Sequence, residues 1–286
     1  MNRLFLILRT VVLLLLASLP CVGTDSPIVL PMPSAPFVAW FEPPALDSQP
    51  ELYRKANLIT SLVERHAAVL PKLAAQGTSG LRWAFGPASA AAEHSGQAAE
   101  FYAKQFNPLL SKDGTMAAGI GIDEWNTGDP KFMQERDAAA AGYRAGRKRW
   151  PNTFAAAWVT QPDDMFISLL RDGTFDLAIV EGYTFIPDVG GLDLDGILRR
   201  CEPFRRAGLL DRTIVCLGYL SAAPDKNGRS MTFAELERLA RAVQERYPQM
   251  PGLAFYGTKD ASPATLALIE RAHELAANLY PRKPSK

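Results

Sequence analysis

Two adjacent carboxylates, Asp123 and Glu124, stand at the end of a run of small and apolar residues that begins at Met116. Trp125 and Asn126 follow them directly. A run of this composition is typical of a strand that is buried on both faces of a parallel sheet. Carboxylates at such a strand end can transfer protons or bind hydroxyl groups. The pair is therefore the first candidate for a catalytic site.

A further carboxylate, Glu181, ends another predicted strand, and Tyr183 follows it. Glycoside hydrolysis uses two carboxyl groups, one as acid and one as nucleophile or base. We predict Glu124 as the general acid and Glu181 as the nucleophile or base, steadied by Tyr183. On a regular strand Asp123 and Glu124 point to opposite faces. If Asp123 faces the interior, it is the acid itself or it positions the acid.

Aromatic and polar side chains also gather at the predicted strand ends. Aromatic rings stack on the C–H faces of sugars and carboxylates bind sugar hydroxyls, so this combination predicts a carbohydrate site. Taken singly, each aromatic residue is more often a core residue than a ligand-binding one. The candidate substrate-binding residues are Trp40, Glu42, Arg82, Trp83, Trp125, Asn126, Trp158, Tyr183, Tyr219 and Tyr256.

Strand-like runs alternate with helix-like stretches along most of the chain. The strand-like runs are Phe37–Glu42, Leu81–Phe85, Met116–Ile122, Thr153–Val159, Phe175–Tyr183, Thr213–Leu220 and Leu253–Tyr256. The helix-like stretches are Pro50–Gln76, Gln97–Leu110, Pro130–Arg149, Pro162–Arg171, Leu194–Ala207, Phe233–Tyr247 and Pro263–Leu279. Single helices between successive strands indicate βαβ units and a parallel sheet.

The alternation and the chain length predict an α/β fold of the (β/α)8 TIM-barrel class, as one domain over residues 37–280. Seven strands are marked rather than eight. Either the eighth lies within Ile28–Leu30 or the long first helix-like stretch, or the barrel has seven strands. A doubly wound open sheet is the alternative, but no predicted strand is followed by the glycine fingerprint of a nucleotide site.

The first 23 residues have the pattern of a secretory signal peptide. Arg3 and Arg9 flank an apolar segment, Val11–Leu16 is aliphatic, and small residues precede a cleavage position after Gly23. The pattern predicts a secreted or periplasmic protein with no membrane contact after cleavage. An uncleaved membrane anchor is the alternative, although the apolar run is short for a span. A Pro-rich leader over 24–36 and a tail over 281–286 complete the chain.

Composition argues against several function classes. The formal net charge of +1 provides no basic field for nucleic acid. None of the three histidines, His66, His94 and His273, ends a predicted strand, which argues against a zinc hydrolase. We predict no metal and no cofactor. Cys201 and Cys216 either form a disulfide after export or remain buried thiols.

The segment Gly-Ile-Asp-Glu-Trp-Asn over residues 121–126 resembles the fourth-strand end of TIM-barrel glycoside hydrolases, where an Asn-Glu pair carries the general acid. Asp123 takes the Asn position. The same strand is similar to that of chitinase-like barrels, which ends in Asp-x-Asp-x-Glu, but this chain has Gly-x-Asp-x-Trp. Glu181-Gly-Tyr183 is similar to a late strand end of those barrels, where a Tyr lies beside an acid. The departures leave the identity of the second carboxylate open.

These observations predict a secreted glycoside hydrolase that acts on carbohydrate. A non-catalytic carbohydrate-binding barrel that has lost one carboxylate is the alternative. The resemblance to TIM-barrel glycoside hydrolases implies a second carboxylate on a late strand, and the predicted strand Leu253–Tyr256 ends without a Glu. A third possibility is an envelope protein without a ligand, which would have a plugged mouth. The sequence does not indicate the substrate sugar or the oligomeric state.

Overall fold

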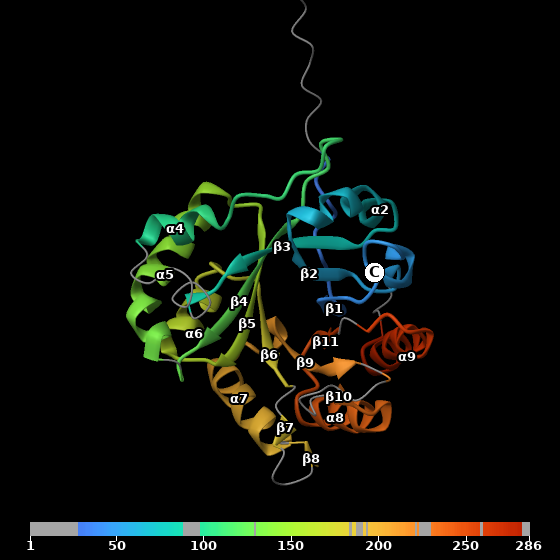
Figure 1. The fold of residues 1–286 in the computed structure, drawn as a ribbon. Helices are drawn as coiled ribbons and strands as arrows, with labels where there is room; N and C mark the ends of the chain where they lie inside the picture. The colour runs from blue at the N-terminus through green and yellow to red at the C-terminus, as the bar shows by residue number, and fades with distance from the viewer. Residues whose placement is uncertain are drawn as a thin grey trace, which may run out of the picture.

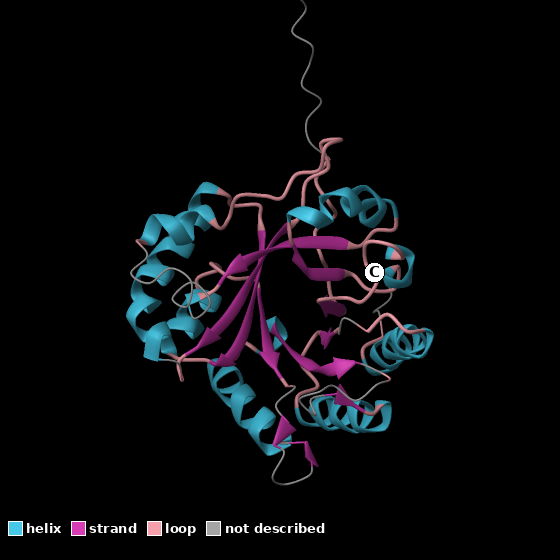
Figure 2. Cartoon of the chain, in the orientation of Figure 1, coloured by secondary structure: helices cyan, strands magenta, loops and turns pink. Residues whose placement is uncertain are grey.

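The computed structural model describes residues 28–87, 98–128, 130–182, 185–186, 191–192, 194–220, 222, 230–257 and 260–281. In this part of the chain, parallel strands form a closed barrel with helices on its outside (Figures 1 and 2). The barrel strands are β1 (Phe37–Phe41), β2 (Leu58–Leu62), β3 (Ser79–Phe85), β4 (Gly119–Asn126), β5 (Phe154–Gln161), β6 (Leu177–Glu181), β9 (Thr213–Leu220) and β11 (Gly252–Tyr256). Pairing of β6 with β9, and of β11 with β9 and β1, closes the ring. The predicted (β/α)8 class is confirmed, with eight strands.

Helices and short strands complete the fold. The helices are η1 (Pro50–Tyr53), η2 (Glu64–Val69), α2 (Leu70–Ala75), α4 (Ala99–Lys104), α5 (Pro130–Arg149), α6 (Asp164–Arg171), α7 (Leu194–Ala207), η4 (Leu210–Arg212), α8 (Phe233–Arg246) and α9 (Pro263–Leu279). β10 (Ser230–Met231) pairs with β9, and β7 (Phe185–Ile186) pairs with β8 (Gly191–Leu192). None of the described helices is long and apolar enough to cross a membrane. The predicted signal peptide and His94 lie outside the described residues.

The eighth strand, β2, lies inside the stretch for which the sequence predicts one long helix. Residues 50–76 instead form η1, β2, η2 and α2 in succession. All five residues of β2 are buried, and β2 pairs with β1 on one side and β3 on the other. A strand buried on both faces is marked in a sequence by a continuous apolar run, and in β2 the polar residues Thr60 and Ser61 interrupt that run. The prediction of one long helix is therefore wrong, whereas the alternative that the eighth strand lies within this stretch is confirmed.

Capping residues mark where the outer helices begin. Apolar residues at helical spacing form the faces that pack against the barrel. Thr232 and Glu235 form a reciprocal capping box at the start of α8, which satisfies two backbone N–H groups. The apolar residues of α8 then recur at helical spacing and are buried against the barrel: Leu236, Leu239, Ala240 and Val243. At the start of α9, Ser262 accepts a hydrogen bond from Thr265 N–H.

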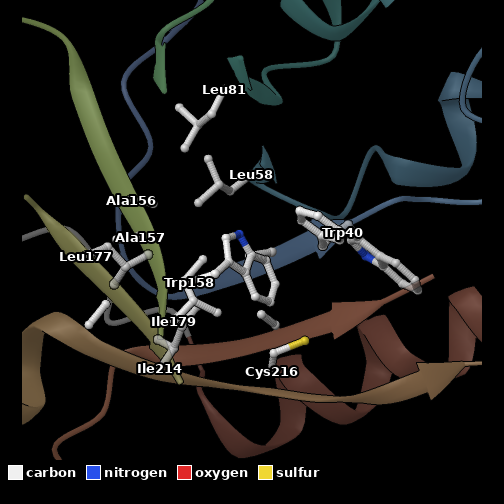
Figure 3. Packing of buried hydrophobic residues seen from close by; sticks show 14 of the residues in the cluster. Trp40, Leu58, Leu81, Ala156, Ala157, Trp158, Leu177, Ile179, Ile214 and Cys216 are labelled. Carbon is white, nitrogen blue, oxygen red and sulfur yellow. The ribbon is translucent and has the colours of Figure 1, made fainter. Parts of the chain in front are cut away.

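Large side chains pack on both sides of the strands. In Figure 3, the indoles of Trp40 on β1 and Trp158 on β5 extend in different directions. The Trp158 ring contacts Phe41, the residue after Trp40, with ring centroids 4.8 Å apart. Cys201 on α7 and Cys216 on β9 are buried and unbonded, so the fold of the described residues contains no disulfide between them. Burial raises the pKa of Cys201 to about 12.

Candidate active site

A pocket of about 890 Å³ opens at the carboxyl ends of the barrel strands. TIM-barrel enzymes carry their active sites at this end. Carboxylates from three strands meet in it: Glu42 directly after β1, Asp123 and Glu124 on β4, and Glu181 at the end of β6. Aromatic rings complete this part of the wall: Phe41, Trp83, Trp158 and Tyr256. The pocket therefore combines acid groups with aromatic surface.

Asp123 faces the interior of the barrel from β4. Gly121, two residues earlier, lies on the same side of the strand. A Cβ at Gly121 would overlap the carbonyl oxygen of Thr60 on β2, which is not a neighbour of β4 in the ring. This side of β4 therefore faces the barrel interior, where the backbone of β2 lies close, and only glycine leaves enough room at position 121.

The environment of Asp123 favours its protonated form. Burial raises the pKa of Asp123 to about 7, and the nearby carboxylates of Glu181, Glu124 and Glu42 act in the same direction. A side-chain hydrogen bond with Trp83 acts in the opposite direction. Asp123 therefore exchanges its proton near neutral pH, in the range useful for acid–base work.

Glu124 reaches the same pocket because β4 is not regular at this point. Its φ is +55°, in the left-handed region that residues other than glycine rarely adopt. The register between β4 and β5 shifts between Ile122 and Trp125, as in a β-bulge. The bulge ends the alternation of faces, so both Asp123 and Glu124 line the pocket. Asn126 Nδ2 donates a hydrogen bond of 2.9 Å to Glu124 Oε1.

The end of β3 packs directly against this bulge. A Cβ at Gly86 would overlap the carbonyl group of Asp123 and the carbonyl oxygen of Glu124. The preceding residue, Phe85, accepts a hydrogen bond of 2.9 Å from the hydroxyl of Tyr143 on α5. The left-handed turn at Glu124 is thus held between a glycine and a strand end that is anchored to a helix.

Glu181 and Glu42 are fixed by hydrogen bonds from different elements. Glu181 is 9% exposed, and its Oε2 accepts a hydrogen bond of 2.8 Å from Thr160 Oγ1 on β5. Glu42 has a φ of +45°; its N–H donates to Ser61 Oγ at 2.8 Å, and its Oε2 accepts from the Tyr256 hydroxyl at 3.2 Å. Among the described residues other than glycine, positive φ occurs at Glu42, Ala45 and Glu124, and all three line the pocket. Such strain commonly collects at functional sites.

Trp40 and Arg82, predicted to bind substrate, do not line the pocket. Trp40 is buried under α9, where its Nε1 donates to His273 Nε2 at 3.0 Å. Arg82 Nη1 donates to the carbonyl oxygens of Gln105 and Asn107 at 3.1 and 3.0 Å, so it ties down the connection after α4. The prediction that both side chains lie at the substrate site is wrong. They point outward from the barrel, whereas the residues next to them in the sequence point inward.

Trp125 and Asn126 also lie off the pocket wall. Trp125 is buried against α6, where its Nε1 donates to Asp163 Oδ1 at 3.1 Å and its ring packs on Phe166. Asn126 contacts the site through its hydrogen bond to Glu124, and its Oδ1 accepts a hydrogen bond from Gly128 N–H. The remaining candidates divide in two: Glu42, Trp83, Trp158 and Tyr256 line the pocket, whereas Tyr183 and the side chain of Tyr219 lie outside the described residues.

A second group of pocket-lining residues, here called the second lobe, was not predicted from the sequence. Its polar residues come from the loop after β1 and from β2 and η2: Asp47, Ser48, Ser61, Arg65 and His66. Ser61, Arg65 and His66 were missed because the end of β2 and η2 lie in the stretch that was predicted as a helix, whereas Asp47 and Ser48 lie in the loop after β1, for which no structure was predicted. Among the described residues, no group of three or more His, Cys, Asp or Glu side chains is placed to hold a metal ion.

Comparison with solved structures shows the fold again. An endo-β-N-acetylglucosaminidase from Cordyceps militaris superposes with a TM-score of 0.60 at 10% identity, over 85% of this chain and 91% of that one. A chitinase domain from Pyrococcus furiosus superposes with a TM-score of 0.57 at 11% identity, over 91% and 100%. A xylanase-A-amylase inhibitor protein superposes with a TM-score of 0.54 at 9% identity, over 84% and 97%. No protein-family model and no curated protein matches the sequence.

Proposed function

We propose that this protein is an exported glycoside hydrolase that cleaves a glycan at the mouth of its barrel. The observation that carries the proposal is the meeting of Asp123, Glu124 and Glu181 in one pocket with aromatic walls. Most glycoside hydrolases use two carboxyl groups, one on each side of the glycosidic bond. The carboxylates here come from β4 and β6, which β5 separates, so they can flank a bound sugar.

The geometry supports a division of roles among the three groups. Glu124 is the proposed general acid, because the bulge presents it at the strand end and Asn126 orients one of its oxygens. Glu181 is the proposed nucleophile or base, held by Thr160. Asp123 lies beside both and keeps a proton near neutral pH, so it can position Glu124 or the substrate by donating a hydrogen bond.

The bulge also accounts for the departure from the chitinase-like strand end. In that series a Glu stands two residues after the Asp, and here that position holds Trp125, which packs on α6. The left-handed residue Glu124 brings a carboxylate into the pocket one position earlier. The proposed site thus keeps a carboxylate beside Asp123 by a change of backbone conformation.

The neighbours suggest which sugars to test first. The Cordyceps militaris enzyme was crystallised as a mutant with fucosyl-N-acetylglucosamine-Asn, and a neighbour from Cycas revoluta was crystallised with (GlcNAc)3. We therefore propose glycans that contain N-acetylglucosamine as the first substrate class. Aryl glycosides of N-acetylglucosamine, glucose and xylose, together with chitin oligomers, form a suitable panel.

The test uses conservative amide variants on the active member of this panel. Glu124→Gln and Glu181→Gln should each lower kcat by about 100-fold or more, because each removes an acid or base and keeps the side-chain shape. Glu237→Gln on the exposed face of α8 is the control and should retain full activity. All variants should unfold at the wild-type temperature within about 2 °C. Full turnover by both site variants would overturn the proposal.

A non-catalytic sugar-binding barrel is the second candidate. The likeness to an inhibitor protein with this fold favours it, as does the absence of a Glu at the end of β11. The two candidates separate in one experiment, in which (GlcNAc)3 is mixed with the wild-type chain. Calorimetric binding without release of shorter sugars over a day would support the binding barrel, and product release would support the hydrolase.

A further inference from the structure

Two segments that lie far apart in the chain, residues 28–32 and 110–116, pair to form a flap just before β4 begins (Figure 1). Leu30 N–H donates to the carbonyl oxygen of Met116 at 2.9 Å, and Met116 N–H donates to that of Ile28 at 2.7 Å. The side chain of Leu30 is buried in the core. The backbone of the flap is therefore fixed to the amino-terminal end of the barrel, opposite the pocket.

The flap carries most of the strongly exposed apolar side chains in the described part of the chain. Five large hydrophobic residues are exposed there, and four of them belong to the flap, with exposed fractions between 50 and 63%. Single exposed apolar residues need no explanation, but a cluster of them marks a surface that binds a protein or a membrane. The four residues are Ile28, Val29, Met32 and Leu110.

Basic side chains occupy the same end of the barrel. Each outer helix returns the chain to the amino-terminal end of the next strand, and lysine or arginine stands in the last turn of α2, α4, α5, α6, α7 and α8. Acidic residues of this end include Asp113, Asp211 and Glu245. They are outnumbered by exposed basic residues that form no ion pair with a described residue: Lys104, Lys112, Lys148, Arg171 and Arg206.

The two ends of the barrel thus differ in charge. The pocket is lined by five carboxylates and by Arg65 as its one lysine or arginine among the described residues. Basic residues at helix ends also suit the helix dipole, so their presence alone does not indicate a partner. Their combination with an apolar flap does, because an anionic bilayer offers acyl chains and negative headgroups on one surface.

The apolar N-terminal part of the sequence precedes the flap closely. Residues 4–19 are mostly leucine, valine and other apolar types. Leu19 and Ile28 are nine positions apart, a separation that an extended chain spans with at most about 32 Å. Apolar segments of this kind partition into the acyl region of a bilayer. With this segment in lipid, the chain holds the flap close to the membrane surface.

We propose that the flap and the basic helix ends bind the surface of an anionic lipid bilayer, with the pocket facing away from it. The apolar side chains enter the boundary between headgroups and acyl chains, and the surrounding lysines and arginines lie at the headgroups. A second copy of the chain fits less well, because pairing the same face would bring like charges together. The proposal concerns the end of the barrel opposite the pocket and does not rest on the proposed function.

The test measures which end of the barrel lies on lipid. The full chain is mixed with vesicles of phosphatidylcholine and phosphatidylglycerol that carry a spin-label quencher on their acyl chains. A fluorescent probe is attached at Leu110→Cys in the flap or at Gln161→Cys, an exposed position at the carboxyl end of β5. Lipid should quench the probe at position 110 at least about threefold more than the probe at position 161, because only the flap enters the bilayer.

The labelling depends on the native cysteines. Both probes are attached in a Cys21→Ser background, and the buried thiols of Cys201 and Cys216 stay unlabelled. Residues 4–19 are retained in every variant and attach each of them to the vesicle in the same way. The comparison therefore reports the orientation of the barrel.

Two double variants separate the apolar from the electrostatic contribution. Val29→Ser with Met32→Ser should lower quenching at position 110 by about twofold, because less apolar surface enters the lipid. Lys148→Gln with Arg206→Gln should lower it by about twofold and remove its dependence on phosphatidylglycerol. Arg238→Gln, an exposed position near the middle of α8, is the control and should change nothing.

Three outcomes would overturn the proposal. Equal quenching at positions 110 and 161 would show that the flap does not face the bilayer. Quenching that is unchanged without phosphatidylglycerol would remove the role of the basic helix ends. Energy transfer between probes on two Leu110→Cys chains, in place of quenching by lipid, would assign the flap to a second copy. None of these measurements uses a sugar, so their failure leaves the proposed function standing, and the reverse also holds.

Discussion

Glu124 determines how many carboxylates reach the pocket, and it does so through its backbone. A regular β4 would direct Asp123 inward and Glu124 toward the helices, as pleat geometry requires. The left-handed φ of Glu124 turns its side chain back to the mouth. Adjacent carboxylates in a sequence can therefore act together only where the strand is interrupted, and here Gly86 makes room for the interruption.

This strain has a measurable consequence at position 124. Glycine adopts positive φ without a steric cost, whereas alanine retains the Cβ that makes this conformation unfavourable. Glu124→Gly should therefore be about 1 kcal/mol more stable than Glu124→Ala, although both lose the carboxylate. Urea unfolding of the two variants measures the difference. Equal stability would contradict a strained backbone at Glu124.

At the scale of elements, the sequence predicts the barrel well. It predicts poorly which face of each strand points into the barrel. Seven of the eight barrel strands and the exact bounds of α5, α7 and α9 follow from apolar runs and helix period. β2 was not marked as a strand because the polar residues Thr60 and Ser61 interrupt its apolar run, whereas the equally buried β6 is apolar up to Glu181. Because β2 was not predicted, the pocket residues of the second lobe at its carboxyl end were not predicted either.

Which side chains of a strand point toward the pocket could not be predicted either. On β1, Trp40 and Phe41 are both buried, and nothing in the sequence distinguishes the side that faces the pocket. A shift of one residue moves every side chain to the other face. The sequence thus identifies strand ends at the mouth, and tertiary packing alone assigns Phe41 and Trp83 to the pocket and Trp40 and Arg82 to the outside.

A matched pair of tryptophan variants tests this assignment. Trp40→Phe removes the N–H that His273 accepts and leaves space under α9, so it should lower the free energy of unfolding by about 1–3 kcal/mol. Its affinity for a bound sugar should stay within twofold of wild type. Trp83→Phe should show the reverse pattern, with weakened ligand binding and a smaller loss of stability. Calorimetric titration and urea unfolding of both variants give the comparison, and the opposite pattern would place Trp40 at the site.

At the scale of the whole molecule, Asp123 and His273 change the pH dependence of stability in opposite directions. Burial raises the pKa of Asp123 to about 7, so between about pH 4 and 7 the folded chain holds a proton that the unfolded chain lacks. Stability from this group falls as pH rises. Burial lowers the pKa of His273 to about 4, so between about pH 4 and 6.5 the unfolded chain holds the extra proton. Stability from His273 rises with pH and is lost on acidification.

Single substitutions should reveal how much each group contributes to the dependence of stability on pH. Asp123→Asn should be about 2–4 kcal/mol more stable than wild type at pH 7.5, and this gain should shrink toward pH 4.5, where wild-type Asp123 is already protonated. His273→Gln retains an acceptor for Trp40 but cannot titrate, so its stability relative to wild type should improve as the pH falls from 6.5 to 4.5. Urea unfolding at pH 4.5, 5.5, 6.5 and 7.5 measures both differences. Parallel curves for the two variants and wild type would show that neither group is buried in its neutral form. Because the two slopes oppose each other, the wild-type curve itself should be flatter across this range than that of either variant.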